Sequence, residues 1–92
     1  MALETTIFTF KISVPFEEWA NGFDSPEVES LHKVNAVKPL YRGVDKDDPQ
    51  SVVVVHQAEE GIAKAFFEAS REAVEATGHI YDSTVITSYL AG

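Results

Sequence analysis

The 92-residue sequence contains no cysteine. A disulfide framework, a thiolate nucleophile, an iron–sulfur cluster and a cysteine-based zinc site are therefore excluded. Basic residues are also few, since seven Lys and Arg stand against fifteen Asp and Glu and give a formal net charge of −8. Such an acidic chain lacks the basic surface that binds phosphates, so we expect neither nucleic acid nor an anionic membrane as a partner.

Long apolar runs are missing as well. No stretch approaches the roughly 18 apolar residues of a membrane-spanning helix, and the first residues lack the pattern of a secretory signal. We therefore expect a cytoplasmic protein. The five glycines are scattered singly and form no phosphate-cradling loop, and the three histidines have no metal-binding spacing. We expect no metal and no cofactor.

What the chain does contain is the composition of a folded domain. It is 45% hydrophobic, 11% aromatic and 24% charged. Ninety-two residues are enough for one hydrophobic core and too few for two independent ones. With no linker or low-complexity tract in the chain, we expect a single domain over residues 1–92.

The hydrophobic pattern predicts four strands. Residues 5–14 alternate with a period of two, which is typical of a strand, and residues 51–57 form the strongest strand of the chain. Residues 37–44 predict a weaker strand, because Pro39 cannot donate to a ladder and indicates an edge. Residues 79–90, rich in β-branched and aromatic types, predict the last strand.

Two helices separate these strands. The first begins after Pro15, is interrupted near residues 21–25 and resumes to about Val34. The second is predicted from residues 59 to 77, where apolar side chains recur at intervals of three and four. The residues of this apolar stripe are Ile62, Phe66, Ala69, Ala73 and Ala76. The predicted order is therefore β-α-β-β-α-β.

This order predicts an α+β, ferredoxin-like fold, a four-stranded antiparallel sheet with both helices on one face. Phe8, Phe10 and Ile12 are expected beneath the helices. Residues 52–55 are four consecutive valines, which indicates burial on both faces of the sheet. A second copy of the chain is the simplest cover for the other face, so we expect a homodimer. The alternative is a monomer with a partly exposed apolar patch.

Several segments resemble a known family. Residues 6–11, 15–19, 39–44 and 55–61 are similar to a family of uncharacterised bacterial proteins within the dimeric α/β-barrel superfamily. That superfamily includes antibiotic-biosynthesis monooxygenases, haem-degrading monooxygenases and stress-responsive barrel proteins. The resemblance spans nearly the whole chain and implies a dimeric α/β barrel. It implies no single activity, because the superfamily hosts several.

The histidines are the first candidates for a catalytic or ligand-binding role inside the fold. His56 lies on the buried parity of the valine strand and is a potential base or ligand-orienting donor. His32, on the first helix, could approach the same cavity. Both are also explained by structural roles, and His79 is expected to be structural, its charged ring at the end of a helix dipole. Burial should lower the pKa of His56 unless Glu59 or Glu60 reaches it.

Aromatic residues and one arginine complete the candidates. Trp19, Phe10 and Phe66 are expected to line an apolar cavity between helices and sheet. Arg42 could hold a ligand carboxylate at the cavity mouth through paired N–H donors. The structural alternatives are plain core packing for the aromatic residues and an ion pair with one of the many acids for Arg42.

Three functions are compatible with these residues. The first is a homodimer that binds a small apolar or amphipathic, fatty-acid-like molecule. The second, implied by the resemblance, is a cofactor-independent monooxygenase with His56 as base and Trp19 or Asn35 as donor to the oxyanion. The third is a structural or regulatory dimer without a ligand. Haem degradation is disfavoured, because the first strand carries no Asn and the tryptophan lies on a helix.

Overall fold

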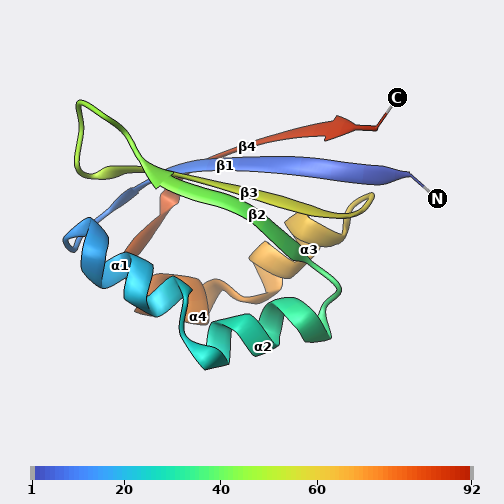
Figure 1. Cartoon of the computed structure of the whole chain (residues 1–92), viewed down its shortest axis with the longest axis horizontal. Helices are drawn as coiled ribbons and strands as arrows, with labels where there is room; N and C mark the ends of the chain where they lie inside the picture. The colour runs from blue at the N-terminus through green and yellow to red at the C-terminus, as the bar shows by residue number, and fades with distance from the viewer. Residues whose placement is uncertain (1, 92) are drawn as a thin grey trace.

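The computed structural model describes residues 2–91, which form one four-stranded sheet. The strands are β1 (Leu3–Ile12), β2 (Lys38–Val44), β3 (Ser51–Glu59) and β4 (His79–Leu90). All neighbouring pairs are antiparallel and the order is β2-β3-β1-β4, with β1 and β3 in the centre (Figure 1). This is the predicted ferredoxin-like arrangement.

The helices of residues 2–91 cover one face of the sheet and leave the other open (Figure 1). They are α1 (Phe16–Phe23), α2 (Pro26–Val34), α3 (Ile62–Ala69) and α4 (Arg71–Ala76). The predicted interruption of the first helix is confirmed. The side chain of Ser25 accepts a hydrogen bond from the Val28 N–H and caps α2, while Pro26 occupies a first-turn position that needs no N–H donor.

The second predicted helix differs from the structure in its start and its continuity. β3 continues to Glu59, where it pairs with Leu3, so the sheet occupies the residue at which the helix was expected to begin, and α3 begins only at Ile62. The turn into α3 uses Gly61 at a φ of 84°, a left-handed conformation that glycine adopts without strain. The helix then stops at Ala69, and Ser70 separates it from α4.

The apolar stripe of this second helix was also predicted one residue out of phase. Ala63 and Phe67 are buried, whereas Ile62 is 39% exposed and Phe66 is only partly buried. Spacings of three and four fit two adjacent faces of a helix about equally well. The ring of Phe67 decides between them, because it packs 5.1 Å from the ring of Phe8 on the central strand.

The strand boundaries lie within a few residues of the prediction. β1 covers residues 3–12 rather than 5–14, and β2 begins at Lys38. Pro39 lies in an edge strand as expected, and the pairing of β2 with β3 shifts between Pro39 and Tyr41. Since an edge strand has one unpaired side, it tolerates a residue that cannot donate a hydrogen bond.

Alternation along the strands separates the core from the open face. On β3, Val54 and His56 are buried beneath the helices, while Val53 and Val55 lie on the opposite parity and are half-buried. Phe8, Phe10 and Ile12 of β1 lie in the core as predicted. The space between this core surface and the helices is where the candidate site forms.

Ala36, just after α2, provides a test of the local backbone. Its φ is 58°, a left-handed conformation in which a Cβ atom is unfavourable. We expect Ala36→Gly to raise the free energy of unfolding by roughly 0.5–1 kcal/mol, measured by urea denaturation. The matched control is Ala65→Gly on the exposed side of α3, which should lower it by a similar amount. A loss of stability in both variants would contradict the left-handed conformation of Ala36.

Candidate functional site

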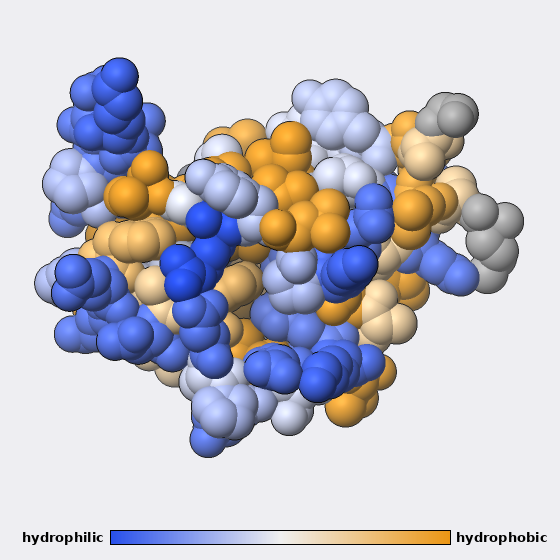
Figure 2. Space-filling model, in the orientation of Figure 1, coloured by the Kyte–Doolittle hydropathy of each residue, from blue (hydrophilic) through white to orange (hydrophobic). Residues whose placement is uncertain are grey.

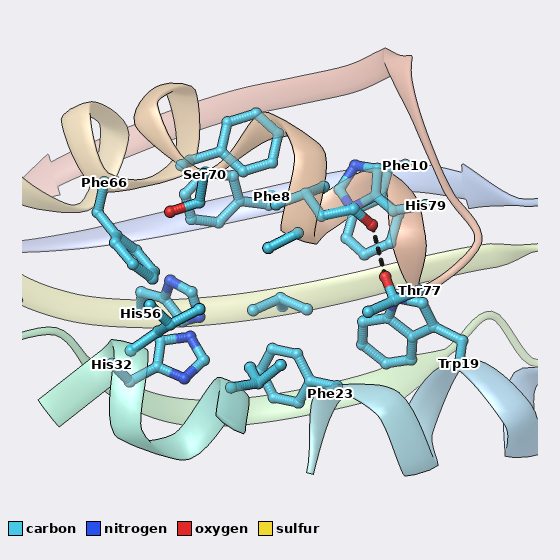
Figure 3. Close-up of a pocket in the computed structure, with 16 residues that line it drawn as sticks. Phe8, Phe10, Trp19, Phe23, His32, His56, Phe66, Ser70, Thr77 and His79 are labelled. Atoms are coloured by element: carbon cyan, nitrogen blue, oxygen red, sulfur yellow. Dashed lines mark hydrogen bonds between the residues drawn. The ribbon is translucent and has the colours of Figure 1, made fainter. Parts of the chain in front are cut away.

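A cavity of about 80 Å³ lies between the helices and the covered face of the sheet. Figure 3 shows side chains from both layers pointing into it. Its aromatic wall consists of Phe8, Phe10, Trp19, Phe23, Phe66 and Phe67. The three histidines of the chain line it as well, and within residues 2–91 no Asp, Glu, Lys or Arg does. The cavity is thus apolar apart from the imidazole rings, the indole of Trp19 and two hydroxyl residues, Ser70 and Thr77.

His56 lies at the floor of this cavity, on the central strand β3. Its side chain is only 6% exposed, and neither ring nitrogen has a hydrogen-bond partner among residues 2–91. Burial, with a smaller contribution from the charge of His32, lowers the pKa of His56 from 6.5 to about 3. The ring is therefore neutral at pH 7, with one nitrogen that donates and one that accepts. Glu59 is exposed and does not contribute to this shift.

His32 projects from α2 toward His56, as the sequence led us to expect. The two ring centroids are 4.9 Å apart and the planes lie at 77° (Figure 3). Burial lowers the pKa of His32, and the backbone of Val28 acts in the opposite direction. A proton on either ring opposes a proton on the other, so the pair favours the doubly neutral form.

His79 departs from the expected role. It stacks on Phe10 with centroids 3.6 Å apart, and its Nε2 lies 2.7 Å from the Thr84 hydroxyl. Burial lowers its pKa to about 4, so the ring is neutral and does not complement a helix dipole as a cation. His79 pairs with the buried Ile12, so strand parity turns it toward the core. The pairing of β4 with β1 shifts between Ile80 and Val85, however, so the alternation in the rest of β4 does not predict this position.

The aromatic candidates lie where they were predicted. Trp19 is 2% exposed and packs between Phe10 and Phe23, with ring centroids 5.6 and 5.1 Å away. Phe66 reaches the cavity beside His32, with centroids 5.4 Å apart. Phe67 also lines the cavity, and the sequence analysis missed it because the apolar stripe was placed one residue out of phase.

Arg42 and Asn35 do not line the cavity. The Arg42 guanidinium forms a paired contact with the Asp24 carboxylate, with Nε to Oδ1 at 3.0 Å, and lies 5.8 Å above the Phe16 ring. This is the ion pair that was the structural alternative for Arg42. The amide of Asn35 donates to the Leu31 carbonyl at 2.8 Å at the end of α2. Neither residue is placed to hold a polar group inside the cavity.

The described residues form neither a metal site nor a membrane-spanning helix. Within residues 2–91, no group of three or more His, Asp and Glu side chains is placed to hold a metal ion. No helix in the same range is long and apolar enough to cross a membrane.

Comparison with known proteins places the chain in a family. Residues 3–91 match the family described as a domain of unknown function, DUF3764. The chain belongs to this family. No curated protein matches it.

Among solved structures, the DUF3764 chain is similar to one described as "Putative antibiotic biosynthesis monooxygenase" from Bacteroides thetaiotaomicron. The TM-score is 0.50 and the identity 15%, over 98% of this chain and 88% of that chain. At such low identity the likeness concerns the fold alone. It agrees with the ferredoxin-like fold expected from the sequence, and the DUF3764 assignment agrees with the expected membership of a family without a known function.

The buried histidines predict acid sensitivity of the DUF3764 domain. The pKa of His56 is lowered on folding, so the unfolded chain binds more protons below pH 6.5 and stability falls as the pH drops toward 3. The slope of the unfolding free energy against pH reflects the protons taken up on unfolding. We expect His56→Leu to take up about one proton fewer, which lowers this slope by about 1.4 kcal/mol per pH unit between pH 6 and 4. Urea denaturation at a series of pH values measures it. The carboxylates titrate alike in the unmodified protein and in the variant. Equal slopes of unfolding free energy against pH in the two would therefore contradict a buried neutral His56.

Proposed function

We propose that this protein is a homodimer that binds a small apolar or amphipathic molecule in the cavity, with His56 bonding to the polar group of the ligand. The observation that carries the proposal is that both ring nitrogens of His56 are buried without a hydrogen-bond partner among residues 2–91. Buried polar groups are satisfied in the great majority of cases, so an exception inside a cavity points to a missing partner.

The energetic cost of this arrangement supports binding. A buried polar atom without a partner costs about 1–3 kcal/mol, and an apolar side chain at the same position would avoid it. Phe8, Phe23 and His32 surround the imidazole and offer it no hydrogen bond. A ligand that brings a hydroxyl or carbonyl group to His56 recovers the lost hydrogen bond and fills the apolar space at the same time.

Volume and charge restrict the ligand further. The cavity of about 80 Å³ is smaller than the roughly 150 Å³ of an engineered cavity that binds benzene, so a complete fatty-acid chain does not fit inside it. A carboxylate beside His56 would be a buried charge without a cation, which is strongly unfavourable. The part of the ligand inside the cavity is therefore short, apolar and neutral, with a single hydrogen-bonding group.

Monooxygenase chemistry is less well supported. It needs a base whose pKa lies near the working pH, whereas the pKa of His56 is about 3. Of the two proposed donors to the oxyanion, Asn35 lies outside the cavity and its amide is bonded to the Leu31 carbonyl. What favours this second function is the similarity of fold, which concerns architecture and not chemistry.

Two probes that differ only in a hydroxyl test the role of His56. We expect 1-hexanol to change the fluorescence of Trp19, the single tryptophan, saturably. His56→Leu should weaken 1-hexanol binding about 5-fold, the loss of one hydrogen bond. Binding of 1-hexene, which has no hydroxyl, should be unchanged or tighter in the same variant. A flat titration with both probes would refute cavity binding, and equal losses for both would refute the hydrogen bond.

The open face of the sheet supports the homodimer. The pairing of the strands places Ile7 beside Val55 and Val85 beside Thr9, so apolar and threonine side chains form the centre of this face. Tyr41 and Tyr89 flank it and are 62% and 58% exposed. Figure 2 shows apolar side chains at the surface along the sheet, in contrast to the hydrophilic loop between β2 and β3. A second copy packed face to face would bury this surface.

A charge on this face should separate the subunits. We expect Val55→Asp to convert the dimer to a monomer, because the carboxylate would be buried without a partner at the interface. Sedimentation velocity at micromolar concentration measures the change. Val34→Asp is the matched control, since Val34 is 83% exposed at the end of α2, on the helical side of the sheet. An unmodified protein that sediments as a monomer would end the proposal of a dimer.

A further inference from the structure

A second hollow lies outside the cavity, between α2 and the beginning of β2. It is an open groove of about 600 Å³, and its apolar wall consists of Phe23, Ala36, Val37 and Pro39. The groove is far larger than the inner cavity and, unlike it, has charged side chains at its border. Phe23 and His32 line both hollows.

Phe23 and His32 therefore form the partition between the cavity and the groove. Their ring centroids are 5.4 Å apart, and both rings lie against His56, at 6.2 and 4.9 Å (Figure 3). In the sheet, Pro39 of the groove pairs with His56 of the cavity. The imidazole without hydrogen-bond partners thus lies directly behind the partition, where a molecule that extends from one hollow to the other would pass it.

Asp24 and Glu29 balance Lys33 and Lys38 in number along the groove, but one of the ion pairs reaches outside it. Arg42 pairs with Asp24, and Lys33 pairs with Glu29 at 3.1 Å. Lys38 also lines the groove, and among residues 2–91 it has no carboxylate within ion-pair distance. The chain as a whole is acidic, with a formal net charge of −8, but at this border of the groove Lys38 attracts an anionic group.

We propose that the groove is the outer compartment of the same binding site and that the ligand is an amphipathic anion. Its neutral end, which carries the group that bonds to His56, passes the Phe23–His32 partition, and its charge stays beside Lys38. This inference rests on the proposed function. It also explains how a small inner cavity serves a longer molecule, because only the neutral end enters the charge-free space near His56. The charged end remains in the groove, where water and Lys38 solvate it.

Octanoate and 1-octanol test the outer compartment, because they share an apolar chain and differ in the charge of the head group. We expect Lys38→Gln to weaken octanoate binding about 3- to 5-fold at low ionic strength and to leave 1-octanol binding within 1.5-fold. Lys46→Gln, in the loop after β2 and outside the groove, is the matched control and should change neither affinity. Titrations that follow Trp19 fluorescence measure all the affinities.

The outcomes separate this inference from the proposed function. If 1-octanol binds and Lys38→Gln behaves like Lys46→Gln with octanoate, the outer compartment is wrong and the cavity proposal stands. If neither probe binds saturably, both proposals fall. A selective loss of octanoate affinity in Lys38→Gln supports the outer compartment.

Stopped-flow kinetics test whether the partition restricts the entry of a ligand into the cavity. We expect Phe23→Leu to raise the association rate constant of octanoate several-fold, because a smaller side chain opens the partition. Phe16→Leu is the control, since Phe16 stacks on the same Trp19 but lines neither hollow. Equal association rates in the two variants would refute Phe23 as part of the partition.

Discussion

The register of β3 is the constraint on which both the cavity and the proposed dimer interface depend. Because side chains alternate along a strand, His56 faces the cavity and Val55, its neighbour, faces the open side of the sheet. A slip of one residue would exchange the two sets, placing the imidazole on the open face and a valine in the cavity. Pairing with β1 on one side and β2 on the other fixes this register along the whole strand.

Strand parity also explains what the sequence could reveal. Phe10 and His56 were correctly expected in one cavity because the period of two assigns each of them to the buried face, and Trp19 followed from the aromatic spacing of the first helix. The contributions of Phe67 and His79 depend on features that periodicity does not record. Phe67 depends on where the sheet ends and α3 begins, and His79 on the register shift of β4 between Ile80 and Val85. Arg42 was ambiguous because its partner, Asp24, lies 18 residues away in the sequence.

The three buried histidines set the electrostatic character of the site. Burial lowers the pKa of each ring, and no carboxylate from residues 2–91 lines the cavity to reverse the shift. Neutral imidazoles add hydrogen-bonding capacity to an apolar space without the desolvation cost of a charge. His79 uses this capacity within the fold through Thr84, whereas His56 does not. This difference between two otherwise similar histidines singles out His56, whose ring has no hydrogen-bond partner in the part of the chain that the structure describes.

The same strand links the proposed interface to the proposed cavity. A pocket can discriminate between ligands only if its polar group is held in a fixed position, and the scaffold that holds His56 is β3. In an isolated subunit, one face of that strand is covered by helices and the other lies open (Figure 1). A second copy packed on Val53 and Val55 would hold β3 from both sides. Dimer formation would then do more than cover apolar surface, because it would restrict the movement of the strand that positions His56 in the cavity.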